Sequence, residues 1–85
     1  MIEKILKMRK NSNTSIELKA LEEELENLNQ ARYYFLASYY VPGLDIAKIS
    51  SLILATNNSR YISFYFRQIE GINLGIFFTK ILSFN

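Results

Sequence analysis

The chain has 85 residues, of which 49% are hydrophobic and 14% aromatic, and its formal net charge is +2. It contains neither cysteine nor histidine, which excludes disulfides, thiolate metal sites and catalysis by a histidine base. A chain of this length forms one domain at most and has a thin core. So many aromatic residues predict either a core dense in Phe and Tyr or an apolar surface that a partner covers.

Residues 1–10 form a basic segment with charges along its whole length, so it does not read as a signal peptide. Its apolar residues lie on one side of a helical projection, which predicts one short helix. The run Asn11-Ser12-Asn13 then favours a turn, because these side chains compete for backbone hydrogen bonds. The cations of the segment are Lys4, Lys7, Arg9 and Lys10.

The stretch from Thr14 to Val41 is predicted to be one long amphipathic helix and the spine of the fold. Thr14 followed by Glu17 is the capping-box pattern of a helix start, and Pro42 prevents the helix from continuing. Long side chains recur at spacings of three and four, which places them on one stripe, as in a coiled coil. The stripe consists of Leu18, Leu21, Leu25, Leu28, Arg32, Phe35 and Tyr39.

Shorter helices are predicted within 44–85, over residues 44–56, 60–70 and 73–84, with Asp45 as a cap and Gly71 as a terminator. The predicted fold class is all-α, a small helical bundle in one domain of residues 1–85. The alternative is an α+β fold with a C-terminal hairpin, because apolar and polar residues also alternate around Gly71. No internal repeat is predicted.

The residues indicate a non-enzymatic protein with no catalytic residues, no cofactor and no metal. Glu22, Glu23 and Glu24 are consecutive on a predicted helix, so their carboxylates point in different directions and do not converge on one ion. The glycines are too scattered for a phosphate-binding loop. Function is therefore expected to lie in binding.

The leading functional hypothesis is a protein interaction or assembly protein that pairs through the coiled-coil-like stripe, as a homodimer or with another protein. The adjoining aromatic residues extend the expected contact. If the leucines of the stripe instead form the core of the protein itself, the interface is expected around Tyr33 and Tyr40. The predicted interface residues are Leu18, Leu21, Leu25, Leu28, Arg32, Tyr33, Tyr34, Phe35, Tyr39 and Tyr40.

The alternative hypothesis is a DNA-binding regulator. Asp45–Ser50 resembles the positioning helix of a helix-turn-helix motif, and 57–63 resembles the polar start of a recognition helix. The resemblance departs from that motif by extra residues over 52–56 and by the missing turn glycine. With the basic segment contacting phosphates, the expected nucleic-acid contacts are Lys7, Arg9, Lys10, Asn57, Asn58, Arg60, Tyr61 and Ser63.

A further alternative is an immunity-type inhibitor that protects a cell from a bacteriocin, which the chain resembles in being short, basic, helical and free of cysteine. Neither of the longest uncharged stretches, 33–44 and 49–59, reaches the ~20 apolar residues of a membrane-spanning helix. An intracellular, cytoplasmic location without a transmembrane segment is therefore expected.

Overall fold

Within residues 1–84, which the computed structural model describes, every regular element is a helix. The all-α prediction is confirmed, and the hairpin alternative is wrong, because two helices occupy the segment in which it was placed. The predicted short helices match the observed ones to within a few residues at each end. The helices are α1 (Ile2–Arg9), α2 (Ser15–Leu28), α3 (Ala31–Tyr40), α4 (Ile46–Ala55), α5 (Ser59–Gln68) and α6 (Leu74–Leu82).

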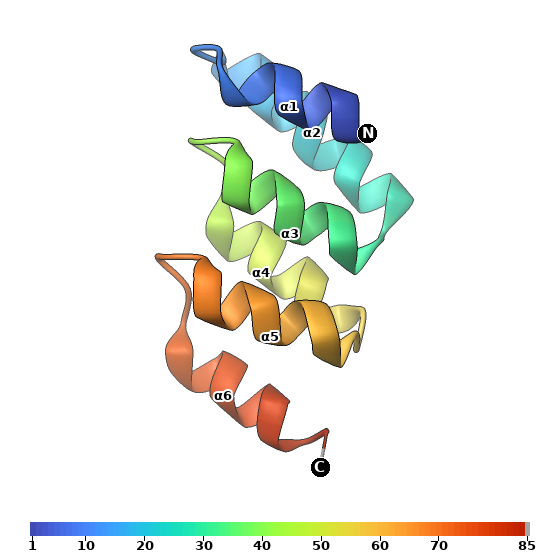
Figure 1. The fold of residues 1–85 in the computed structure, drawn as a ribbon, viewed down its shortest axis with the longest axis vertical. Helices are drawn as coiled ribbons and strands as arrows, with labels where there is room; N and C mark the ends of the chain where they lie inside the picture. Colours follow the sequence, from blue (N-terminus) through green and yellow to red (C-terminus); the bar gives the residue numbers. More distant parts are fainter. Residues whose placement is uncertain (85) are drawn as a thin grey trace.

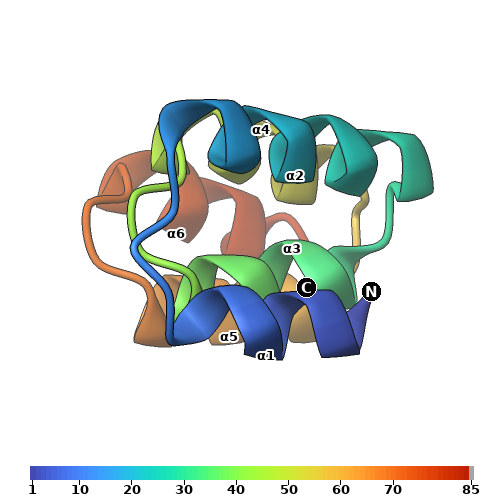
Figure 2. The ribbon, with the colours of Figure 1, turned by 90° about the horizontal axis from the view of Figure 1, so that it is seen from above.

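The six helices stack in two layers (Figures 1 and 2). Helices α1, α3 and α5 run parallel in one layer, and α2, α4 and α6 return in the other. The stack measures 39 Å along its longest axis and 22 × 17 Å across it. The pair α1 and α2 lies at one end of that axis and α6 at the other (Figure 1). This arrangement of successive antiparallel helix pairs is that of a short solenoid.

The predicted single helix over 14–41 is wrong, because the chain reverses at Asn29 and Gln30. Asn29 adopts a left-handed conformation (φ 49°, ψ 50°) and Gln30 is extended. The hydroxyl of Tyr34 donates a hydrogen bond of 3.0 Å to the Asn29 side-chain oxygen. A continuous helix of 28 residues would be about 42 Å long, slightly longer than the 39 Å of the whole stack. The reversal lets two shorter helices bury their apolar sides on one core.

The turns repeat along the chain, which corrects the expectation of no internal repeat. Among the described residues the left-handed positions are Asn29, Gly43, Asn57 and Gly71. The two asparagines are 28 residues apart, as are the two glycines. Asparagine and glycine are the residues that adopt this conformation at least cost. The repeating unit is therefore one helix pair with one turn of each kind.

Each helix of the second layer begins at a side-chain cap. Thr14 and Glu17 form the predicted capping box of α2, and hydrogen bonds from the Thr14 backbone and side chain lower the pKa of the Glu17 carboxyl. The predicted cap Asp45 accepts from the Lys48 backbone N–H at 3.1 Å, and Asn73 caps α6 in the same way. Polar side chains thus fix where these helices start.

The core lies between the layers and uses the same 28-residue spacing. Leu21, Ile49 and Phe77 occupy equivalent positions on α2, α4 and α6, and each is at most 1% exposed. From the other layer, Tyr65 stacks on Phe77 with ring centroids 5.5 Å apart. The Tyr65 hydroxyl shares a hydrogen bond of 2.9 Å with Ser38. Some of the many aromatic residues of the sequence therefore form the core.

One polar contact joins the first two helices of the second layer. The side chain of Glu22 is 7% exposed, and its Oε2 accepts a hydrogen bond of 2.9 Å from the Asp45 backbone N–H. A carboxylate at a helix N-terminus interacts favourably with the helix dipole and with unpaired backbone N–H groups. Glu22 therefore holds the start of α4 against α2.

The substitution Leu25→Ala should lower the free energy of unfolding by about 2–5 kcal/mol, because Leu25 is fully buried and its removal leaves a cavity. Chemical denaturation measures the change. Leu28→Ala on the same helix is the matched control, since Leu28 is 43% exposed, and it should cost about 0.5 kcal/mol or less. An equal loss of unfolding free energy in the two variants would contradict the difference in burial between Leu25 and Leu28.

Stability should fall as the pH rises above about 10, the pKa of tyrosine in an unfolded chain. Burial raises the pKa of Tyr65, so the folded protein keeps a proton that the unfolded chain loses, and unfolding becomes more favourable. Tyr65→Phe should remove this contribution and flatten the dependence of the unfolding free energy between pH 9 and 11. Identical slopes for the variant and the parent protein would show that Tyr65 titrates equally in both states.

Candidate functional site

The outer side of the α1, α3 and α5 layer carries aromatic and cationic side chains. On α5, Ile62 and Tyr65 are buried in the core. Arg60, Phe64 and Arg67 recur at spacings of four and three, which places them together on the opposite side of the helix. Helix α5 lies in the layer opposite α6 (Figure 2), and because Ile62 and Tyr65 face the core, the side with Arg60, Phe64 and Arg67 faces outward. The fold therefore leaves it open.

Aromatic rings link α3 and α5 on this side. Phe35 lies 6.2 Å from Tyr61 and 5.9 Å from Phe64, measured between ring centroids. Tyr39 lies 5.8 Å from Phe35 and packs edge-to-face on Tyr40 at 4.9 Å. These separations lie in the range of favourable aromatic pairs. The rings form one continuous cluster across two helices.

Three arginines lie against rings of the cluster. The guanidinium carbons of Arg60 and Arg67 lie 5.7 and 5.4 Å from the centroid of the Phe64 ring. Arg9 of α1 lies 5.7 Å from the Tyr40 ring. Such contacts hold the flat guanidinium against a ring while N–H groups at its edge can still reach an anion. The Nε–H of Arg67 donates a hydrogen bond of 3.4 Å to the Ser63 carbonyl oxygen, which leaves its terminal N–H groups for a partner. Neither α3 nor α5 contains an acidic residue.

We call this region the aromatic–arginine surface. A shallow groove of about 360 Å³ runs between its rings and is lined in part by Tyr39, Phe64 and Gln68. Tyr39 is 51% exposed, and the other rings are half-buried. The groove therefore offers apolar walls with polar tips to a partner. The surface consists of Phe35, Tyr39, Tyr40, Tyr61, Phe64, Arg60 and Arg67.

The two layers differ in charge. Helix α2 carries a dense run of glutamates and a single lysine, whereas α1, α3 and α5 carry a single acid, Glu3. One ion pair, Lys4 with Glu24, joins the basic α1 to the acidic α2. Both of its side chains are nearly half exposed, so it contributes little to stability. The cations of α3 and α5 have no carboxylate of their own helices to neutralise them.

The structure divides the predicted interface residues between the core and the surface. Leu21, Leu25 and Tyr34 are fully buried, and Leu18 packs against the core. Leu28 ends α2 and is 43% exposed. The remaining predicted residues belong to α3, where Arg32 lies 5.2 Å from the Tyr33 ring and the rest join the aromatic–arginine surface. These are Phe35, Tyr39 and Tyr40.

The predicted nucleic-acid contacts are not gathered in one place. Lys7, Arg9 and Lys10 lie at the C-terminal end of α1, whereas 57–63 begins α5 at the opposite corner of the layer (Figure 1). The Asn58 side chain caps α5 by accepting from the Tyr61 backbone N–H, and Asn57 accepts from Lys80. Helices α4 and α5 run antiparallel in different layers (Figure 2). Only Arg60 and Tyr61 of this set belong to the aromatic–arginine surface.

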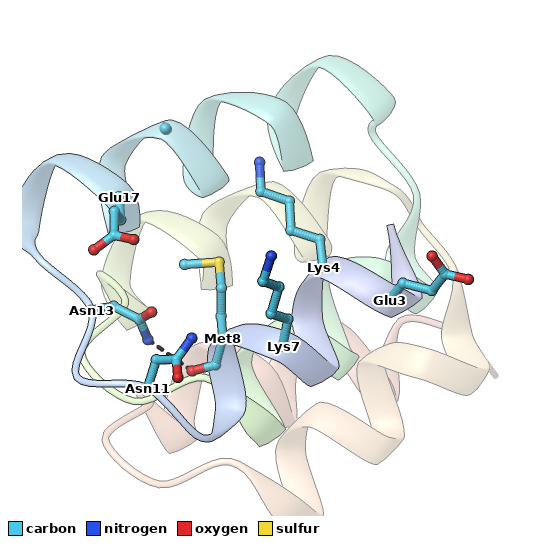
Figure 3. A pocket seen from close by; sticks show the side chains of 8 residues that line it. Glu3, Lys4, Lys7, Met8, Asn11, Asn13 and Glu17 are labelled. Atoms are coloured by element: carbon cyan, nitrogen blue, oxygen red, sulfur yellow. Dashed lines mark hydrogen bonds between the residues drawn. The ribbon is translucent and has the colours of Figure 1, made fainter.

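A second groove, of about 540 Å³, lies between α1 and α2 (Figure 3). Lys4 and Lys7 extend into it from α1, and Glu17 lies at its edge on α2 (Figure 3). Asn13 donates a hydrogen bond of 2.9 Å to the Met8 carbonyl oxygen at one end. The groove is open and its charges are mixed, unlike the apolar and enclosed sites that hold small molecules.

No group of acidic residues within 1–84 is arranged to hold a metal ion. In the same residues, no helix combines the length and apolar character that crossing a bilayer requires.

Two residues of the surface, Phe64 and Arg67, were missed by sequence reasoning. The signal that finds them is the helical spacing of Arg60, Phe64 and Arg67 opposite the buried Ile62. That signal is readable only when 59–68 is taken as a helix with a known inner side. A helix over 60–70 was predicted, but its inner side was not, so the shared outer side of Arg60, Phe64 and Arg67 was not identified.

Comparison with known proteins gives no matching family model, no similar curated protein and no similar solved structure. The function must therefore be inferred from the residues of this chain.

The open side of the surface predicts that its residues can be changed without unfolding the protein. Tyr39→Ala and Arg67→Ala should each lower the free energy of unfolding by about 1 kcal/mol or less, because only exposed or edge contacts are lost. Thermal melting followed by circular dichroism measures this. A loss above about 2 kcal/mol in either variant would mean that the surface supports the fold itself.

Proposed function

We propose that the protein is a non-enzymatic interaction protein whose aromatic–arginine surface binds an acidic segment of another protein. The observation that carries the proposal is the pairing of exposed tyrosine and arginine on two helices that lack any acid. Tyrosine and arginine are enriched among the residues that dominate binding energy at protein interfaces. Stacked helix pairs present such residues on a preformed surface, which lowers the entropy cost of binding.

The chemistry of the partner follows from the charges. Arg60 and Arg67 flank the Phe64 ring and present N–H donors that suit a carboxylate in a paired geometry. The groove beside Tyr39 accepts a large apolar side chain. A segment with an acidic residue beside a large apolar residue satisfies both features. Such a partner also gains a faster encounter, because the opposite charges attract at a distance.

The same charges argue against this surface as a homodimer contact. If two copies faced each other here, Arg60 and Arg67 of one copy would lie against Arg60 and Arg67 of the other. Like charges across an interface are unfavourable. The proposal therefore keeps Tyr39 and Tyr40 from the predicted interface. Their partner is a different protein and not a second copy of this chain. An immunity-type inhibitor is one form that such binding would take.

A single-stranded nucleic acid is the second candidate partner. The aromatic–arginine surface suits it better than it suits duplex DNA bound by a helix-turn-helix motif. Single-stranded nucleic acids bind to cationic grooves in which aromatic side chains stack on bases. Tyr39 and Tyr61 would supply rings and Arg60 a phosphate contact. This candidate makes a distinct prediction, since its affinity falls steeply as salt is added.

A peptide selection tests the first candidate. A displayed library of random 12-residue peptides is panned on the protein and counter-selected on the Arg60→Glu/Arg67→Glu variant. The recovered peptides should contain Asp or Glu next to a large apolar residue. Loss of two charged hydrogen bonds should weaken their binding to the double variant by at least about tenfold, as measured by calorimetry.

The variant Lys19→Glu/Lys48→Glu is the matched control, because it changes the net charge equally on the other layer and should leave peptide binding intact. Peptides that bind both double variants as they bind the parent protein would refute the proposed surface. Labelled oligothymidine and a mixed duplex are titrated in parallel at low and moderate salt. Salt-sensitive binding of either, with no peptide recovered, would establish the second candidate instead.

A further inference from the structure

The outer side of α6 is apolar and uncovered. Leu74, Phe78 and Leu82 are 61%, 55% and 54% exposed, and their spacing of four residues makes them one ridge along the helix. The only charged residue of α6, Lys80, hydrogen-bonds to Asn57 instead. We call these three residues the α6 ridge. Contiguous exposed apolar patches of this kind mark interaction sites on folded proteins.

The internal repeat identifies this ridge as a stacking face. Phe78 is equivalent to Ser50 of α4 and Glu22 of α2, at steps of 28 residues. Ser50 and Glu22 are 8% and 7% exposed, and Glu22 bonds to the start of the following helix of its layer. Phe78 occupies the same position with no described helix beyond it. Its exposed ring is therefore on the side that the stack elsewhere uses for contact between helices.

The opposite end of the stack matches the ridge less well than the ridge matches itself, because its apolar residues lie among charged ones. The exposed apolar side chains of α1 and α2 are Ile2, Leu6 and Ile16. Helices α1 and α2 present the open groove of mixed charge there, with Lys4, Lys7 and Glu17 at its walls (Figure 3). Seating Leu and Phe side chains over these groups would bury charges without partners, which is strongly unfavourable. Head-to-tail stacking of copies is thereby disfavoured.

The geometry points to a second copy of this chain as the occupant of the α6 ridge, related to the first by a two-fold axis. In such a pair the ridge faces its own equivalent, so apolar side chains meet apolar side chains and no like charges are opposed. Ridges formed by residues four apart interdigitate when two helices cross at about 50°. Gly75 and Thr79 lie beside the ridge and are small, which allows the two helices to approach closely.

The size of the end sets the expected strength of this dimer. A stack with a cross-section of 22 × 17 Å offers a flat area of roughly 370 Å² per copy, below the ≈ 800 Å² per partner of a standard interface. The dimer should therefore be weak and dependent on concentration. The pairing leaves the aromatic–arginine surface of each copy free. A dimer would thus present two binding surfaces to a partner, which raises avidity.

Sedimentation equilibrium of the full chain from about 10 to 1,000 µM tests the proposal. The parent protein should change from monomer towards dimer over this range, whereas Phe78→Glu should remain monomeric because it places a charge in the apolar contact. Leu74→Lys is a second disrupting variant. Ile16→Glu on α2 is the matched control, since Ile16 is 79% exposed far from the ridge, and it should dimerise as the parent does. Circular dichroism verifies that each variant is folded.

A mixing experiment tests the two-fold arrangement. Phe78→Glu and Phe78→Lys should each be monomeric alone, and an equimolar mixture should form a heterodimer, because the opposite charges meet across the axis. A parent protein that stays monomeric at every concentration would overturn the proposal, as would open-ended growth beyond the dimer or a dimer unaffected by both ridge variants. These outcomes are independent of the peptide selection, which concerns a different surface.

Discussion

Four left-handed backbone positions control this architecture. Asn29 and Asn57 return the chain from the second layer to the first, and Gly43 and Gly71 lie in the turns that lead out again. Gly43 has φ +89°, which strains any other residue, and an added Cβ would lie 3.0 Å from a side-chain carbon of Leu18, which would have to shift. Because the two kinds of turn alternate, every helix of one layer points the same way. The layers and their separate surfaces follow from that alternation.

The parallel order within the first layer places side chains from distant parts of the sequence next to each other. Phe35 and Phe64 are almost thirty residues apart, yet their rings touch because α3 and α5 are adjacent and in register. Ser38 and Tyr65 make the equivalent contact nearer the core. The interior pairs are satisfied within the protein, whereas the outer rings and their arginines are not enclosed. The proposed binding surface thus depends on the same register that builds the core.

The local parts of the fold were predictable from sequence and the tertiary parts were not. Thr14, Asp45 and Pro42 are strong local signals, and the helices after Pro42 were placed well. The break at Asn29 was missed because the spacing of leucines and aromatics continues across it. The hydrogen bond from Tyr34 to Asn29 spans only five residues, but it forms after the chain has turned. The core that the two helices share joins residues far apart in the sequence, which a local pattern does not show. The candidate site was found in part: Phe35, Tyr39 and Tyr40 were named, whereas Phe64 and Arg67 depend on knowing the inner side of α5.

The residues at the equivalent positions Glu22, Ser50 and Phe78 become less polar along the stack. Glu22 can be buried because its carboxylate meets the N-terminus of α4, which compensates for its lost hydration. Ser50 is smaller, so α4 and α6 leave an open groove of about 340 Å³ beside it. Phe78 has no polar group that requires a partner, and its exposure to water is the unfavourable state. The same position therefore links two helices in α2 and is an exposed apolar side chain in α6. The residue at this position therefore meets water only at the α6 end of the stack, where it is apolar and its burial is favourable.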